Sequence, residues 1–389
     1  MGICISTSSY SSEIYDIEHG PENAVYYEEI KDATEGNQVV CSLHSQQGSK
    51  GTNQDYGIIY QGYGMEQGTF CGVFDGHGLN GHTVSKLVRN RLPSLLLNQR
   101  NDIVRYNSAS NDDRNIENWK EVCVGGFRVM DKELKLMENL DCTCSGTTAV
   151  TAIKQGEDLV IANLGDSRAV LGTISQNGIW AVQLTTDLKP CVPMEAERIR
   201  SCNGRVLALK DESHVQRVWL PSEDSPGLAM SRAFGDFILK NHGVISIPHI
   251  TYHHLNSSDQ FLVLATDGVW DVLSNNEVVS IIWAAKSEEA AAEAVVDAAT
   301  AAWEHKYPTT RRDDCTVLQS LHLERRTEEK GGGGESNGGE RRRERSGRGH
   351  RRWSWCGRFV GDRGSDERED DGEECDERDC GVRECHCLE

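Results

Sequence analysis

Long hydrophobic runs are absent from this sequence of 389 residues, of which only 37% are hydrophobic. No stretch approaches the roughly 20 consecutive apolar residues that a membrane-spanning helix needs. The chain also opens without the apolar segment of a secretory signal peptide. We therefore expect a soluble, cytoplasmic protein.

Positive charge is also in short supply. Lysine and arginine number 41 against 61 aspartate and glutamate residues, which gives a formal net charge of −20. A surface this negative repels nucleic acid phosphates and attracts divalent cations. We therefore expect no nucleic acid partner.

Cysteine, in contrast, is abundant, with 14 residues, but its distribution does not predict a disulfide scaffold. Cys71, Cys202 and Cys315 occur singly in the central part of the chain. Isolated cysteines of this kind are usually buried thiols in a reducing compartment. This distribution agrees with an intracellular location.

Composition divides the chain into three parts. Residues 1–38 are rich in Ser, Tyr and Glu without a sustained period, and we expect a flexible arm. Residues 39–322 carry strand and helix patterns and are long enough to form one domain with a large core. Residues 323–389 contain a Gly-rich linker, a basic block and then an acidic block, and we expect a disordered charged tail.

The acidic end of the tail contains four cysteines and a histidine. A zinc cluster is an alternative to disorder, but the cysteine spacings of 5, 5 and 2 match no common structural zinc pattern, so disorder is favoured. The residues are Cys375, Cys380, Cys385, His386 and Cys387.

The first six residues fit an acylation signal. Gly2 and Ser6 match the acceptor pattern for N-myristoylation, and Cys4 could carry a second acyl chain. Two such signals are needed for stable anchoring, which would make the protein peripheral at a membrane. Because the pattern demands little beyond Gly2 and Ser6, a chance match is the alternative.

The central part alternates runs of strands with pairs of helices. Strand patterns occur at 39–45, 56–62, 69–74, 147–153, 158–164, 168–174, 179–184, 260–266 and 315–321, and helical patterns at 79–97, 116–138, 194–202, 275–285 and 288–304. Residues 98–115 are expected to be a surface loop. Hairpin-like runs favour antiparallel strands, so we predict an α+β fold, a four-layer α-β-β-α sandwich of two antiparallel sheets packed face to face with helices outside.

Aspartates stand at the ends of several of these apolar runs. Asp75, Asp166 and Asp267 each follow one, and Asp313 and Asp314 precede the last. Carboxylates held close together at strand ends repel one another unless cations lie between them, and all-oxygen sites suit Mg²⁺ or Mn²⁺. The pattern predicts a metal-dependent hydrolase.

Asp75 opens a tight turn, Asp75-Gly76-His77-Gly78. Because glycine lets the backbone approach a ligand closely, the Gly76 carbonyl could be an oxygen ligand beside Asp75. His77 would then lie within reach of whatever the metals hold. A turn with a solvated histidine is the alternative, and this motif alone would not decide between them.

The turn does not stand alone. The accompanying motifs, in chain order, are Lys50-Gly51-Thr52-Asn53-Gln54-Asp55, Ser145-Gly146-Thr147-Thr148-Ala149, Gly165-Asp166-Ser167-Arg168, Ser231-Arg232-Ala233-Phe234-Gly235-Asp236-Phe237, Ala265-Thr266-Asp267-Gly268-Val269-Trp270-Asp271 and Arg312-Asp313-Asp314-Cys315. This ordered set resembles the metal-dependent serine/threonine protein phosphatases of the 2C type. Asn53-Gln54-Asp55 and Met130-Asp131-Lys132-Glu133-Leu134 are similar to the plant members of that family.

The resemblance implies a pair of divalent cations, Mn²⁺ or Mg²⁺. Asp75 would bridge both ions, with the Gly76 carbonyl on one and Asp267 and Asp313 on the other. Asp55 would support the cluster directly or through water. A hydroxide between the ions would attack phosphorus in line with the leaving seryl or threonyl oxygen.

The resemblance also implies roles for residues around the metal pair. Lys50 would be the counter-charge for the substrate phosphate, and His77 would donate a proton to the leaving alkoxide. Asp166, with Asp267 and Asp271, matches the place where the family can hold a third ion.

Two positions depart from the family pattern. Many members have arginine where Lys50 stands, and lysine cannot hold phosphate bidentately, so we expect a weaker phosphate site. Gln54 occupies a position that is often glutamate. Its neutral amide lowers the negative charge around the metals. Residues 205–227 match a variable flap near the active site of the family, with a plain surface loop as the alternative.

These features imply an active protein serine/threonine phosphatase in intracellular signalling, with phosphoprotein substrates and a monomeric state. One alternative is a pseudophosphatase that binds kinases or receptors without turnover. Another is a phosphatase for small molecules or nucleotides. The intact motif residues Asp75, Gly76, His77, Asp267 and Asp313 favour activity.

Overall fold

The computed structural model describes residues 23–28, 41–65, 67–106 and 116–321. The chain divides into two compact units, Met1–Arg326 and Thr327–Glu389, and all described residues belong to the first. Our predictions for Gly2, Cys4 and the tail at 323–389 therefore fall outside the described residues.

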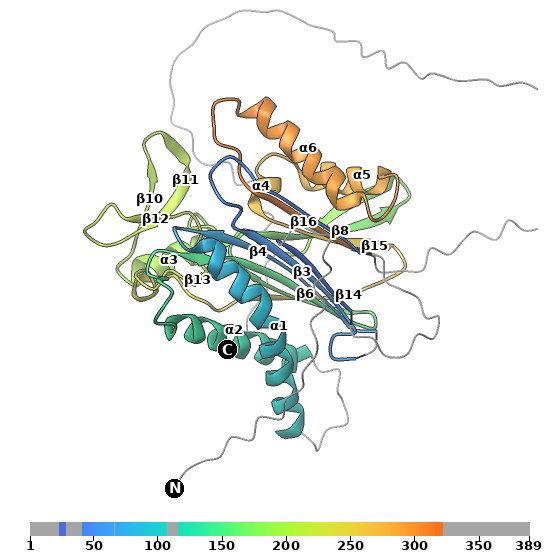
Figure 1. The fold of residues 1–389 in the computed structure, drawn as a ribbon, viewed down its shortest axis with the longest axis horizontal. Helices are drawn as coiled ribbons and strands as arrows, with labels where there is room; N and C mark the ends of the chain where they lie inside the picture. Colours follow the sequence, from blue (N-terminus) through green and yellow to red (C-terminus); the bar gives the residue numbers. More distant parts are fainter. Residues whose placement is uncertain (1–22, 29–40, 66, 107–115, 322–389) are drawn as a thin grey trace, which may run out of the picture. The chain divides into compact units, whose positions relative to one another are not determined.

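The elements of the first unit follow one another along the chain as drawn in Figure 1. They are β1 (Ala24–Glu28), β2 (Cys41–Gln46), β3 (Asp55–Gln61), β4 (Thr69–His77), α1 (Gly81–Tyr106), α2 (Ile116–Lys135), β5 (Gly146–Thr147), β6 (Ala149–Gln155), β7 (Asp158–Leu164), β8 (Arg168–Ser175), β9 (Gly178–Gln183), α3 (Pro193–Ser201), β10 (Arg205–Leu209), β11 (Glu212–Trp219), β12 (Pro226–Leu228), β13 (Phe234–Gly235), the 3-10 helix η1 (Lys240–His242), β14 (His249–His254), β15 (Asp259–Ala265), α4 (Asp267–Trp270), α5 (Asn275–Ala284), α6 (Ala291–Lys306) and β16 (Cys315–Leu321).

Two sheets form the centre of this unit. The first runs β1-β3-β4-β6-β7-β14, with β5 joined to β4 and β13 joined to β5, and the second runs β2-β16-β15-β8-β9. Among the described strands of these sheets, only β1 has a parallel neighbour, β3. The antiparallel arrangement predicted from the hairpin-like runs is confirmed.

Both faces of the first sheet are covered because apolar side chains along its strands point alternately to one face and the other. In β4, Phe70 and Phe74 belong to the apolar cluster shared with α1 and α2, whereas Cys71 and Val73 belong to the cluster shared with the second sheet. Successive side chains of a strand point to opposite faces, so one apolar run serves two cores.

Helices complete the layers. Helices α1 and α2 cover the outer face of the first sheet, and α4, α5 and α6 cover the outer face of the second (Figure 1). Between the sheets lies a third apolar cluster, formed by strand residues from both. The predicted four-layer α-β-β-α sandwich is confirmed.

A separate three-stranded antiparallel sheet of β10, β11 and β12 stands at one end of the sandwich, beside α3 (Figure 1). Residues 205–227 are therefore an ordered sheet and not a plain surface loop. The sequence pattern is weak there because the strand register shifts between Ala208 and Leu209 and again between Val218 and Trp219. Such irregularities interrupt the alternation that marks a strand.

Three further segments differ from expectation. Residues 24–28, inside the expected flexible arm, form β1 through main-chain pairing with β3. Helix α1 continues to Tyr106, so the surface loop expected at 98–115 is wrong for 98–106; Ile103 packs against the helix-side core and extends the helix. Strand β14 went unpredicted because its sequence, His249–His254, holds little apolar alternation.

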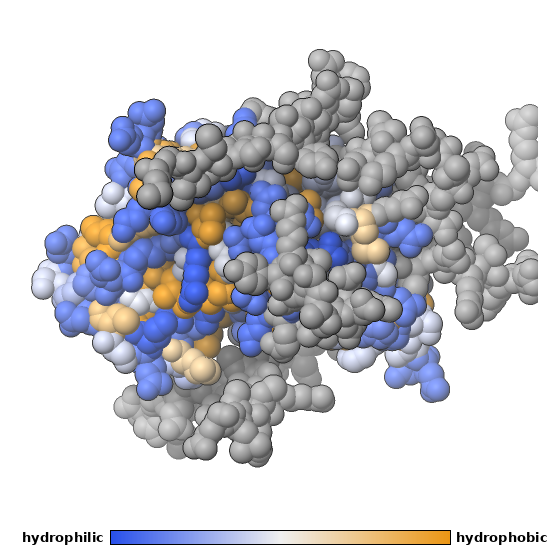
Figure 2. All heavy atoms as spheres, turned by 90° about the horizontal axis from the view of Figure 1, so that it is seen from below, coloured by the Kyte–Doolittle hydropathy of each residue, from blue (hydrophilic) through white to orange (hydrophobic). Residues whose placement is uncertain are grey.

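The surface of the first unit mixes apolar and charged residues. In the view of Figure 2, hydrophobic surface is broken up by hydrophilic side chains wherever described residues are visible. Within the described ranges, no helix is long and apolar enough to cross a membrane.

Candidate active site

Strand pairing brings the predicted acidic residues together. Asp55 in β3 lies directly opposite Asp75 in β4. Strands β15 and β16 are antiparallel neighbours, so Asp267, just after β15, and Asp313, just before β16, leave the same end of the second sheet. Asp166 follows β7 of the first sheet.

These carboxylates raise one another's pKa. Withdrawal from water, together with the charges of Asp267 and Asp55, raises the pKa of Asp75 well above its usual value. Burial and the charges of Asp313 and Asp166 do the same to the pKa of Asp267. Burial is the main cause that raises the pKa of Asp166 to about 6 and that of Asp55 to about 8. The charged cluster is unfavourable by itself, and a bound cation would relieve the repulsion.

The donor set fits hard divalent cations. All the donors are oxygens, and Oδ1 of Asp166 is buried without a hydrogen-bond partner. Across the described ranges, no three His, Cys, Asp or Glu side chains lie close enough to hold an ion on their own. Mg²⁺ usually keeps several waters and takes one or two carboxylates, so an open cluster suits it better than a closed cage. Asp75, Asp267 and Asp313 are only partly buried, which leaves room for such waters.

Gly76 occupies a place where no side chain fits. A Cβ atom there would lie 2.5 Å from the carbonyl oxygen of Gly81 and 2.7 Å from that of Gln54. The Gly76 backbone N–H donates to the same Gln54 oxygen at 3.1 Å. The glycine therefore fixes the end of β4 beside Asp75, as a backbone ligand would require.

Asp55 is fully enclosed and connects the two sheets. Its Oδ2 accepts a hydrogen bond of 2.7 Å from Oγ1 of Thr266, the residue before Asp267. Its backbone N–H donates to Oδ1 of Asn53 at 3.0 Å. These contacts place Asp55 behind the partly exposed carboxylates, where it can support them.

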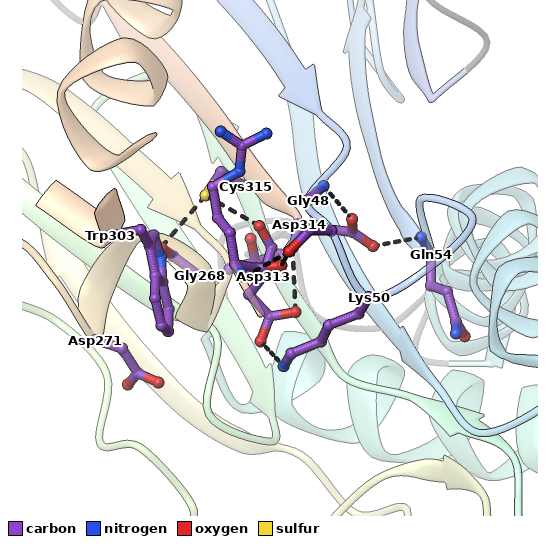
Figure 3. A network of polar contacts seen from close by, with 12 residues as sticks. Gly48, Lys50, Gln54, Gly268, Asp271, Trp303, Asp313, Asp314 and Cys315 are labelled. Atoms are coloured by element: carbon purple, nitrogen blue, oxygen red, sulfur yellow. Dashed lines mark hydrogen bonds and ion pairs between the residues drawn. The ribbon is translucent and has the colours of Figure 1, made fainter. Parts of the chain in front are cut away.

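Lys50 reaches the site from the loop before β3. Its ammonium group donates to Oδ2 of Asp313, while Oδ1 and Oδ2 of Asp314 accept from the backbone N–H groups of Gly48 (2.7 Å) and Gln54 (2.8 Å) (Figure 3). Asp314 thus anchors the loop that carries Lys50. The two adjacent aspartates have different tasks: Asp313 faces the cluster and Asp314 holds the loop.

His77 lies against a carboxylate that comes from a distant part of the chain. Nε2 of His77 is 2.7 Å from Oδ2 of Asp236, whose side chain is 1% exposed. Burial alone would lower the pKa of His77, but the charge and hydrogen bond of Asp236 outweigh it and raise the pKa. A histidine that is protonated near neutral pH can act as a proton donor.

Asp271, predicted for a third ion, lies at the edge of the cluster, away from Lys50 and Asp313 in Figure 3. Its Oδ1 is 3.7 Å from Nζ of Lys189. Burial raises the pKa of Asp271, and the charge of Lys189 opposes that rise. Burial would lower the pKa of Lys189, but the nearby charges of Asp166, Asp271 and Asp267 outweigh it and raise the pKa.

All the predicted site residues inside the described ranges therefore gather in one place, and their roles as ligands stay predictions. Sequence reasoning missed Asp236 and Lys189 as participants. Asp236 sits in a motif that was recognised, but no spacing rule connects it to His77, which is 159 positions away. Lys189 carries no motif signal, and only the fold places it near Asp166.

Comparison with known proteins agrees with this geometry. A profile of the family described as Protein phosphatase 2C matches residues 40–306. The Arabidopsis thaliana protein named "Probable protein phosphatase 2C 72" is 54% identical over 326 residues, covering 82% of this chain and 97% of the relative. The rice (Oryza sativa subsp. japonica) protein named "Probable protein phosphatase 2C 12" is 48% identical over 356 residues, covering 82% and 90%.

A solved structure shares the fold. The serine-threonine phosphatase 2C from Toxoplasma gondii superimposes with a TM-score of 0.66 at 25% identity, over 73% of this chain and 94% of that one. The acidic cluster at the strand ends, the layered sandwich and these relatives lead to one conclusion. The chain belongs to the protein phosphatase 2C family, as a plant-type member.

Proposed function

We propose that the protein is a metal-dependent phosphatase that hydrolyses phosphoserine and phosphothreonine in other proteins, as part of intracellular signalling. The observation that carries the proposal is the convergence of Asp75, Asp267 and Asp313 from both sheets on one partly exposed cluster whose members repel one another. Such a cluster has no structural benefit without cations. The similarity to named protein phosphatases supports the choice of reaction.

The residues that would hold the cations are those of the cluster. Asp75 and the Gly76 carbonyl would serve one Mn²⁺ or Mg²⁺, and Asp75, Asp267 and Asp313 the other. Asp166, Asp267 and Asp271 would offer a weaker third site. When bound, the ions would lower the pKa of water enough for it to attack phosphorus at neutral pH.

The chain's own groups handle the substrate and its leaving group. Lys50, with a side chain that is 53% exposed, can move from Asp313 to the substrate phosphate at little cost because exposed ion pairs are weak. His77 would donate a proton to the departing seryl or threonyl oxygen, which is a poor leaving group without one. The flap sheet of β10, β11 and β12 would present protein substrates to this site.

The test is release of phosphate by the full-length protein. A phosphothreonine peptide, an aryl phosphate and a nucleotide would each be supplied with Mn²⁺, and then with EDTA. We expect metal-dependent release from the peptide at a rate well above that from the nucleotide. Faster release from the nucleotide would contradict the protein substrate class, and no metal-dependent release would leave only a binding role.

We also propose that the protein acts as a cytoplasmic monomer that associates with membranes through acylation of Gly2 and Cys4. The first six residues support acylation by their match to the acceptor pattern.

A further inference from the structure

A short strand separates His77 from Asp236. Strand β5 pairs with β4 on one side, with Gly146 opposite His77, and with β13 on the other, with Gly146 opposite Gly235. The imidazole and the carboxylate therefore approach each other across Gly146. A Cβ atom on Gly146 would lie 2.9 Å from Nε2 of His77 and 2.4 Å from Oδ2 of Asp236, so only glycine leaves space for this contact.

Asp236 is held in a backbone conformation that aspartate seldom adopts. Its φ is +49°, in the left-handed region. Its backbone N–H donates to the carbonyl oxygen of Ser145 at 3.0 Å, which stabilises the turn. Unfavourable conformations of this kind persist where the surrounding structure fixes them, often at functional sites.

A partly buried ion pair supports the same turn from helix α2. Oδ1 of Asp131 accepts a hydrogen bond of 3.0 Å from the backbone N–H of Gly235, the residue before Asp236. Nζ of Lys240 lies 3.0 Å from Oδ2 of Asp131 and also donates to the Ala233 carbonyl at 2.7 Å. Asp131 and Lys240 thus fix both sides of the turn that presents Asp236.

The two nitrogens of His77 have different environments. Nε2 is engaged by Asp236, whereas Nδ1 is buried and has no hydrogen-bond partner among the described residues. A carboxylate that accepts from one ring nitrogen determines the tautomer and orientation of a histidine. Nδ1 is therefore the ring nitrogen of His77 that no described group engages.

We propose that Asp236 is a positioning residue, which holds the His77 ring by Nε2 so that Nδ1 carries the proton given to the leaving oxygen. The inference rests on the proposed phosphatase function. As water oxygen bonds to phosphorus, the bond from phosphorus to the seryl oxygen breaks and its electron pair stays on that oxygen. That oxygen takes the Nδ1 proton, and the neutral imidazole keeps its Nε2 proton against Asp236.

The kinetic test compares leaving groups in the full-length protein with Mg²⁺. Asp236→Asn should lower kcat on a phosphoserine peptide roughly 10- to 100-fold, because the alkoxide needs a proton donor. It should lower kcat on p-nitrophenyl phosphate by less than about threefold, because that leaving group is stable without a proton. In a His77→Ala background, Asp236→Asn should have no further effect on the peptide.

The chain offers a matched control. Asp259 holds His253 in the same way, with Oδ2 and Nε2 2.9 Å apart and the carboxylate 2% exposed, but it lies outside the site. Asp259→Asn should leave the ratio of the two rates at the wild-type value. Equal losses on both substrates for Asp236→Asn, or losses that add to those of His77→Ala, would overturn the role of Asp236.

A spectroscopic measurement tests the geometry without any variant. The ¹⁵N shifts of the His77 ring in the Mg²⁺ form should report a proton on Nε2 in the neutral imidazole; a proton on Nδ1 in its place would overturn the proposal. If the wild type itself releases no phosphate from either substrate, the proposed function fails and this role with it. If the wild type is active, the variant comparison decides on Asp236 alone.

Discussion

At the scale of single residues, the carboxylates of the cluster favour metal binding at the expense of the metal-free fold. Asp75→Asn should abolish metal-dependent turnover, because the proposed bridging ligand is lost. The same change should raise the free energy of unfolding in EDTA, because it removes a carboxylate whose pKa is raised by burial and by the charges of Asp267 and Asp55. Urea unfolding of both proteins measures this difference, and a less stable metal-free variant would contradict it.

The same charges predict how stability depends on pH. Asp55 has a pKa of about 8 in the folded protein against a usual value near 3.8, so the folded state binds more protons between these values than the unfolded state. The free energy of unfolding in EDTA should therefore fall as pH rises from about 4 to 8. Saturating Mg²⁺ should reverse or flatten this slope; a metal-free protein that gains stability over the interval would contradict the assignment.

The individual site residues were predictable to different degrees. Asp75 and Asp267 stand out in the sequence because each ends an apolar run and begins a glycine turn. Asp236 does not, because its contact with His77 depends on strand β5 lying between them. The separate tasks of Asp313 and Asp314 also depend on the loop at Gly48, which no local pattern reveals.

At the scale of secondary-structure elements, Glu195 joins α3 to the segment before β13. Its carboxylate, 3% exposed, accepts bidentate hydrogen bonds from Arg198 and from Arg232, and another from the Ser231 hydroxyl. Burial would raise the pKa of Glu195, but the hydrogen bonds from the two arginines lower it to about 2.

Glu195→Gln should lower the free energy of unfolding by about 3 kcal/mol, because it leaves two partly buried guanidinium groups without their charge partner. The wild-type advantage should be complete above the unfolded pKa near 4.5 and should be lost as pH falls toward 2. Glu212→Gln is the control, since its pair with Arg217 is more exposed than the Glu195 cluster and should be worth less than about 1 kcal/mol. Equal effects of the two changes in urea unfolding would contradict the role of Glu195.

The elements that sequence patterns predicted are those with regular periods. Strands β4, β7 and β15 each contain an apolar run and were predicted within a few residues. Strand β14 was missed because it lies at the edge of the first sheet and contains no apolar run. Its His253 and His254 pair with the carboxylates of Asp259 and Asp158.

At the scale of the whole molecule, membrane attachment would add a second level of control to the phosphatase fold. Wild-type protein expressed in plant cells should partition partly with membranes, and Gly2→Ala should move it to the soluble fraction, because stable anchoring needs two signals and Cys4 alone supplies at most one. Cys4→Ser should give an intermediate distribution. Equal partition of wild type and Gly2→Ala would contradict acylation of the amino terminus.

The central claim is that carboxylates from both sheets converge to hold a pair of divalent cations, and this is a property of the complete sandwich. Crystals of the protein grown with Mn²⁺ and measured at the manganese absorption edge test it most directly. We expect two anomalous peaks, bridged by Asp75, with Gly76 on one and Asp267 and Asp313 on the other. An anomalous map without peaks at these residues under saturating Mn²⁺ would contradict the account.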